Sequence, residues 1–159
     1  MFRIVLRKRW VIYLVEKIIS GIANVLDQNY PDAAIYAQEV KQHMREPCFF
    51  IQCLEVGTSK RLAHRYDQIR PFEIVYFPKK KEDAREIQRV LGELPFLLEF
   101  IQLPDGPVMG SKMESKIKDD LGHFLVNYDF PVRRQVDEGP NMEEIEIMGG
   151  IKFDSETEK

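Results

Sequence analysis

The sequence predicts an α+β fold, a mostly antiparallel β-sheet with two amphipathic helices packed on it. Two segments repeat apolar residues every three or four positions, which is the spacing of a helix that buries one face. Other segments alternate apolar and polar residues, or form short runs rich in aromatic and β-branched side chains, as strands do. In chain order the elements read helix, three strands, helix and further strands.

The first helix is expected from Val11 to Leu26. Gly21 lies inside this segment, where glycine costs about 1 kcal/mol relative to alanine, and it therefore suggests a close packing contact. The turn-forming residues 29–32 end the helix. The apolar stripe consists of Ile12, Val15, Ile19, Ile22 and Leu26, widened by Ile18 and Val25.

Three strands are expected after this helix, at Ala33–Val40, Cys48–Val56 and Phe72–Phe77. The second begins with apolar residues on both faces, which predicts a central strand covered on both sides. Its two cysteines, Cys48 and Cys53, stand at an odd spacing and point to opposite faces. We expect both to be small core residues that do not bridge each other.

The connection between the second and third of these strands, Gly57–Arg70, is basic. Its cations allow two interpretations: a patch that contacts nucleic-acid phosphates, or a charged hairpin that projects from the sheet. Tyr66 is its only aromatic residue, which is too few for a surface that stacks bases, and we favour the hairpin. The residues concerned are Lys60, Arg61, His64, Arg65 and Arg70.

A second helix is expected to start within Pro78–Asp83, where acidic residues suit the helix dipole. Gly92 and Pro95 predict that it ends near Leu94. The following segment, Phe96–Leu103, is short and aromatic and is expected to be a strand. The apolar stripe of the helix is Ala84, Ile87, Val90, Leu91 and Leu94.

The last third predicts a hairpin of two strands, Val108–Lys118 and His123–Val132. Turns are expected at Pro104–Pro107 before it and at 119–122 within it. Asp119 and Asp120 lack the alternating ligands of a calcium loop, so we interpret them as turn residues. One face of the second strand is apolar at Phe124, Val126, Tyr128, Phe130 and Val132.

Charge is distributed unevenly along the 159 residues, although the net charge is only -3. We expect a basic leader at 1–10, a single domain at 11–134 and an acidic C-terminal tail at 135–159, with both ends as flexible arms. Met142–Met148 would form a strand only where another surface offers it an edge. The apolar run Trp10–Val15 is too short for a membrane span, which needs about 20 residues, so a protein made in the cytosol is expected.

The sequence predicts no enzyme, cofactor or metal site. The three histidines are scattered, and no cysteine pair completes a zinc site. There is no glycine-rich phosphate loop, no nucleophile motif and no pair of carboxylates inside an apolar strand. A function is therefore expected to reside in surfaces and not in catalysis.

Three groups of residues nevertheless carry a family resemblance. They are the run Glu46–Phe50, the pair Arg65–Tyr66 followed by Pro71–Phe72 and Tyr76–Pro78, and the run His123–Asp129. In this order, over Leu14 to Val132, the chain resembles a phage tail terminator family of prophages and phage-like tails in Gram-positive bacteria. The motifs are core and turn residues, and the resemblance carries over no catalytic residue.

The resemblance implies a virion tail protein, assembled in the bacterial host cytoplasm, that caps the growing tail tube and stops its polymerisation. It also implies a ring of subunits, six in number, with the tail tube protein, a neck or connector protein and the sheath protein as candidate partners. No membrane and no specific nucleic acid are expected as partners.

Three residues of the basic connection, Lys60, Arg61 and Arg65, are the candidate assembly contacts. A ring needs two different patches on each subunit, and the basic leader and the acidic tail are one complementary pair. The alternatives are a neck or head-completion protein and, from another class, a small nucleic-acid-binding regulator.

Overall fold

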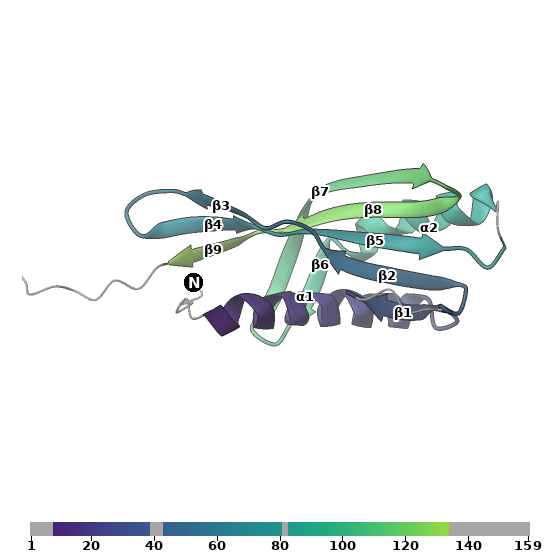
Figure 1. Ribbon diagram of the computed structural model, residues 1–159, viewed down its shortest axis with the longest axis horizontal. Coiled ribbons are helices and arrows are strands. Elements are labelled where there is room, and N and C mark those ends of the chain that lie inside the picture. Colours follow the sequence, from purple (N-terminus) through teal and green to yellow (C-terminus); the bar gives the residue numbers. More distant parts are fainter. Residues whose placement is uncertain (1–7, 39–42, 81–82, 134–159) are drawn as a thin grey trace, which may run out of the picture.

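The computed structural model describes residues 8–38, 43–80 and 83–133, which form two helices and two β-sheets (Figure 1). A six-stranded sheet has the order β1-β2-β5-β8-β7-β6, and a three-stranded sheet has the order β3-β4-β9. All strand pairs are antiparallel except β1 with β2, which are parallel. The α+β prediction is therefore confirmed. Residues 1–7 of the expected leader at 1–10 and the whole of the expected tail at 135–159 lie outside the described residues.

Helix α1 spans Lys8–Asn29 and begins three residues before the expected start, inside the segment interpreted as a basic leader. Its predicted apolar stripe is confirmed from Val15 to Leu26, where Ile18, Ile22 and Leu26 are fully buried in the core. The side chain of Ile12 lies outside the described residues. The close contact expected at Gly21 is also present. A Cβ at Gly21 would lie 3.0 Å from Leu103 Cδ2, so glycine lets α1 approach β6.

The six-stranded sheet forms the body of the molecule. Its central strands β2, β5 and β8 lie between flanking strands, and β2 is apolar on both faces as expected. Cys48 and Cys53 are free, with Cys48 buried and Cys53 half-buried. The strands are β1 Ala34–Ala37, β2 Cys48–Cys53, β5 Pro71–Phe77, β6 Phe100–Leu103, β7 Gly106–Lys118 and β8 Leu121–Tyr128.

Both helices pack on the same face of this sheet. Buried side chains of α1 and of α2, Ala84–Leu97, belong to one apolar cluster with Phe49, Ile74 and Phe124. These three side chains share one face of the sheet. Phe49 stands opposite Tyr76, which lies two residues from Ile74 on β5, and Ile74 stands opposite Phe124. The N-cap of α2 is Asp83, whose carboxylate accepts a hydrogen bond from Glu86 N at 3.1 Å.

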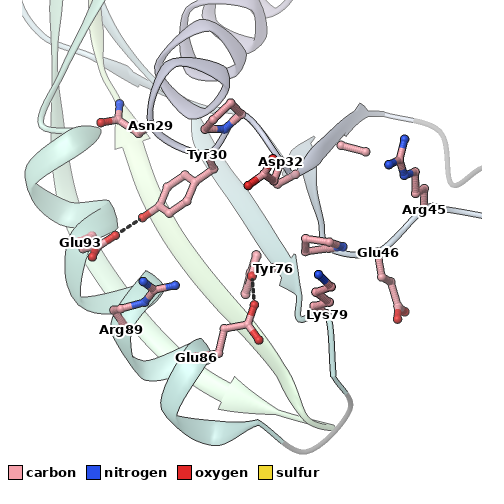
Figure 2. A pocket seen from close by; sticks show the side chains of 14 residues that line it. Asn29, Tyr30, Asp32, Arg45, Glu46, Tyr76, Lys79, Glu86, Arg89 and Glu93 are labelled. Atoms are coloured by element: carbon pink, nitrogen blue, oxygen red, sulfur yellow. Dashed lines mark hydrogen bonds between the residues drawn. The ribbon is translucent and has the colours of Figure 1, made fainter.

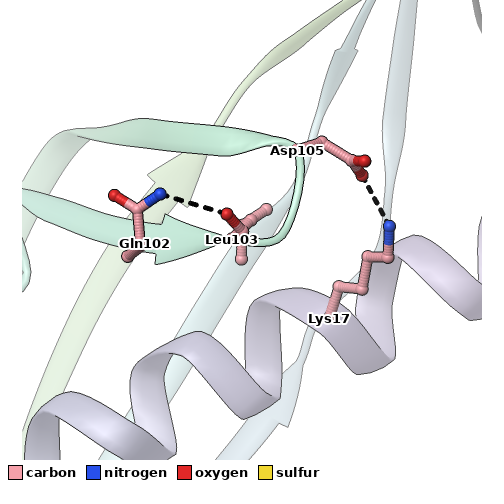
Figure 3. Close-up of polar contacts among 4 residues, drawn as sticks. All are labelled: Lys17, Gln102, Leu103 and Asp105. Atoms are coloured by element: carbon pink, nitrogen blue, oxygen red, sulfur yellow. Dashed lines mark hydrogen bonds and ion pairs between the residues drawn. The ribbon is translucent and has the colours of Figure 1, made fainter.

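Strand β7 bends sharply, and the bend brings the far edge of the sheet onto α1. Its first half pairs with β6 and its second half with β8, and the register shifts between Ser111 and Glu114. Gly110 lies at the bend, where a Cβ would come within 2.8 Å of Val126 Cγ2. Glycine is therefore required for the close approach. Lys17 of α1 is bound to Asp105 in the β6–β7 turn at 2.5 Å (Figure 3).

The end of α2 differs from the prediction. The helix continues through Pro95 to Leu97, and β6 begins only at Phe100, so the expected strand over Phe96–Leu103 is wrong in its first half. Pro95 lies in the last turn, where only one hydrogen bond is lost, and Leu98 N still bonds to Leu94 O at 2.9 Å. Leu94 and Leu98 are both fully buried at helical spacing, and this burial keeps the turn helical.

The three-stranded sheet continues the larger sheet, because two of its strands, β4 and β9, are each separated from a strand of the larger sheet by a single residue. It consists of β3 Gly57–Lys60, β4 Arg65–Ile69 and β9 Phe130–Arg133. The expected strand His123–Val132 is interrupted at Asp129, where β8 ends and β9 begins, and β4 passes into β5 at Arg70. The alternating burial of Phe124 through Val132 nonetheless holds across the break. The predicted turn after β7 is a two-residue loop, Asp119–Asp120, with positive φ at both residues.

Candidate functional site

The basic connection folds as the expected hairpin. Strands β3 and β4 are antiparallel, and their turn is closed by a hydrogen bond from Arg65 N to Leu62 O at 3.1 Å. Ala63 in the turn has a φ of 54°, in the left-handed region. In Figure 1 the hairpin projects beyond the helices at one end of the molecule.

The three candidate assembly contacts lie together at the distal end of this hairpin. Lys60 ends β3, Arg61 begins the turn and Arg65 starts β4, and all three are exposed. Arg61 Nε forms an ion pair with Asp67 Oδ2 on β4, and Arg61 N donates to Arg65 O at 2.9 Å. The backbone therefore holds the three cations on one small, solvent-facing end.

Arg70 does not belong to this charged end, although the sequence places it in the same basic connection. Its side chain is 1% exposed at the junction of the two sheets, and Nη2 donates to Gln68 Oε1 at 2.5 Å. Among the described residues, Nε and Nη1 have no hydrogen-bond partner. Burial lowers the pKa of Arg70, with the Cys53 thiol opposing that shift. Arg70 is therefore a residue of the interior, and a basic surface that includes it is excluded.

No strand of the described chain pairs with the outer edge of the hairpin. β3 is the outer strand of its sheet, and all four of its residues are exposed. Apolar side chains flank it, with Leu54 36%, Val56 41% and Leu62 80% exposed. We call β3 with these flanking residues and the three cations the β3 edge. Exposed apolar side chains beside an unpaired strand edge are features of a surface that binds another chain.

A cleft of about 960 Å³ lies where α1 ends, beside α2 and the end of β5 (Figure 2). Cations and carboxylates both line it, so its charge is mixed. The residues that line it come from four separate parts of the chain, which is why no local sequence signal indicates it. The charged ones are Asp32, Arg45, Glu46, Lys79, Glu86, Arg89 and Glu93.

Two tyrosines brace this cleft. Tyr30 Oη donates to Glu93 Oε2 and Tyr76 Oη donates to Glu86 Oε1, each at 2.5 Å. Burial, followed by these hydrogen bonds to carboxylates, raises the pKa of both tyrosines above its usual range. Both phenols therefore stay neutral donors. Both rings also pack on Phe49, so the contacts join the two helices to the sheet.

The face of the large sheet opposite the helices carries a polar row across three strands. Gln52 Nε2 donates to Glu73 Oε2 at 2.5 Å, and His123 Nδ1 lies 2.9 Å from Glu73 Oε1. Burial acts to raise the pKa of Glu73, but the hydrogen bonds from His123 and Gln52, with the nearby charges, lower it overall. This row ties the strands together.

In the part of the chain that the structure describes, no group of three or more His, Cys, Asp or Glu side chains could hold a metal ion. None of the described helices is long and apolar enough to cross a membrane.

Comparison with known proteins decides the family. The sequence profile of a phage tail terminator protein family matches residues 17–140. The chain belongs to this phage tail terminator family. No curated protein matches the chain. One solved structure, aligned over 78% of this chain and 96% of its own, has 12% sequence identity and a TM-score of 0.45. A likeness this weak adds nothing to the family assignment.

Family membership agrees with the resemblance carried by the core and turn motifs. The matched range includes the hairpin, the cleft and all strands of both sheets. Of the described residues it leaves out only 8–16, the first part of α1. It makes the chain a phage tail-related structural protein. Of the features above, sequence reasoning located the hairpin cations, whereas it missed the cleft and wrongly grouped Arg70 with the surface.

Proposed function

We propose that this protein is a tail terminator that forms a ring on the last ring of the tail tube, stops tube polymerisation and joins the tail to the head or neck. The family match over most of the chain is the observation that carries this proposal. The ring is a homo-oligomer of six subunits in the virion tail. Its partners are the tail tube protein, a neck or connector protein and the sheath protein.

The surfaces of the molecule suit such a role. A closed ring joins two different patches of each subunit, and the molecule offers distinct surfaces at its two ends. The β3 edge lies at one end of the molecule. The mixed-charge cleft lies at the other end, beside the C-terminal ends of α1 and β5. The apolar core that joins both helices to the large sheet lies between these two surfaces.

A deletion of the gene in its phage tests termination. Tails longer than those of the parent, seen by electron microscopy, are the expected result, because polymerisation would lack its cap. Complementation with the intact gene should restore the parental length. Tails of normal length that fail to join heads would instead support the neck or head-completion alternative.

Negative-stain images of the purified protein test the ring independently. Closed rings of uniform diameter are expected. A protein that stays monomeric and shifts nonspecific DNA in a gel would support the nucleic-acid-binding regulator, because phosphate binding by cations needs no ring.

A further inference from the structure

The β3 edge is the strongest feature of the surface that the fold leaves unexplained. One side of β3 pairs with β4, its other side has no partner strand among the described residues, and its four residues are exposed in the single chain. An exposed strand edge readily accepts a strand from another chain, with main-chain hydrogen bonds supplying affinity. The question is therefore which segment pairs with it.

The chain itself contains a segment of matching chemistry beyond the described residues. Met142–Met148 reads MEEIEIM, in which Ile145 and Ile147 alternate with Glu144 and Glu146. As a strand it would present isoleucines on one face and carboxylates on the other. The β3 edge offers a partner for each face. Val56 before β3 and Leu62 in the turn are apolar and exposed, and Lys60 and Arg61 between them are cationic.

Among the other edge strands of the two sheets, β1, β6 and β9, the exposed β6 is less suitable for an acidic segment. β6 is the last strand of the six-stranded sheet, and Phe100 and Met109 are exposed beside it. However, carboxylates flank it, at the exposed residues Glu99 and Asp105. Like charges next to each other across strands destabilise pairing. The β3 edge has one flanking carboxylate, Glu55, beside its three exposed cations, so charge favours β3 over β6.

The position where the described chain ends favours pairing between subunits. β9 ends at Arg133, which stands opposite Arg65 at the tip of the hairpin, at the far end from the large sheet. The residues from 134 to 141 can reach up to roughly 28 Å from that point when extended. A tail that leaves from the outermost end of one subunit is well placed to reach its neighbour.

We propose that residues 142–148 of one subunit add as a β-strand to the β3 edge of the neighbouring subunit. The interface is heterologous, with a tail on one side and a hairpin on the other, and it repeats around a closed ring. The inference rests on the proposed function in one respect, namely that the subunits form a ring. It identifies the acidic tail as the partner of Lys60 and Arg61.

Charge reversal on each side tests the pairing in the full-length protein. One variant carries Lys60→Glu and Arg61→Glu, and the other carries Glu144→Lys and Glu146→Lys. Each alone should raise the dissociation constant of the oligomer at least about tenfold in light scattering at low salt. A variant with Arg85→Glu and Lys118→Glu, which reverses two exposed cations outside the hairpin, should assemble like the wild type.

Mixing the two variants distinguishes a neighbour's tail from the subunit's own. In an equimolar mixture, each hairpin meets an opposite charge only on the tail of the other variant, so the mixture should recover the oligomer. A single chain with all four reversals should also assemble. Recovery in that chain without recovery in the mixture would overturn the inference, because the tail would then fold back on its own hairpin.

The apolar half of the interface has its own variant, Ile145→Ser with Ile147→Ser. It should also weaken the oligomer, by a factor that is similar at low and high salt because the lost contacts are uncharged. Rings that persist in all of these variants would refute the tail pairing and leave the ring intact. A wild-type protein that is monomeric at every concentration would instead refute the proposed ring itself.

Discussion

The two sheets of this protein are joined by continuous stretches of chain, since β4 passes into β5 and β8 is followed by β9, but they differ in what covers them. In the six-stranded sheet the core side chains of β2, β5 and β8 are fully buried under two helices. In the three-stranded sheet β3 is exposed throughout. The large sheet therefore supplies most of the folding free energy, and the hairpin is free to carry charges and an open edge for assembly.

The largest expected effect comes from the core of the large sheet. Phe124→Ala should lower the free energy of unfolding by about 3–5 kcal/mol, because a fully buried ring leaves a cavity. The matched control is Phe96→Ala, since Phe96 is 82% exposed at the end of α2. This substitution should change the free energy of unfolding by less than about 0.5 kcal/mol. Urea denaturation measures both, and similar losses in the two variants would contradict the comparison.

The bend of β7 should be the next most sensitive point. Gly110→Ala is expected to cost about 1–3 kcal/mol, because its Cβ would lie 2.8 Å from Val126 Cγ2 and 2.9 Å from Leu98 O. Gly92→Ala is the control, with nothing within 4 Å of its Cβ on α2. It should stabilise the protein by up to about 1 kcal/mol. A neutral Gly110→Ala would show that the bend has room to relax.

The polar row on the helix-free face should have a smaller, pH-dependent effect. The pKa of Glu73 is lower in the folded than in the unfolded protein, so its contribution is present above the unfolded pKa and is lost as pH falls through the folded one. Glu73→Gln should therefore reduce the decrease in the free energy of unfolding on acidification, by less than about 1 kcal/mol. Urea denaturation across this pH range measures the difference, with Glu99→Gln at an exposed position as the control. Equal acid sensitivity of Glu73→Gln and the wild type would show that the polar row does not stabilise the fold through the Glu73 carboxylate.

The smallest effect on stability is expected in the hairpin. Reversing Lys60, Arg61 and Arg65 together to Glu should change the free energy of unfolding by at most about 1 kcal/mol, since all three are exposed. Assembly should nevertheless weaken, as measured by light scattering. Loss of DNA retention with unaltered assembly would show instead that the three cations contact phosphate.

The sequence by itself determined the class of fold, both helices and the hairpin position. Periodicity carries this information, because a buried face repeats every three to four residues in a helix and every two in a strand. The stripe of α1 and the alternation from Phe124 to Val132 were therefore readable along the chain. The cations of the hairpin were equally local, since a solvated turn needs no distant contact.

Only the tertiary structure decided the features that join distant segments. Pro95 stays helical because Leu98 is buried in the core, and Arg70 is interior because two sheets meet there. The cleft exists because α1, α2 and β5 end beside one another. Burial of a residue depends on what packs over it from elsewhere in the chain, and neither its own type nor its immediate neighbours report that packing.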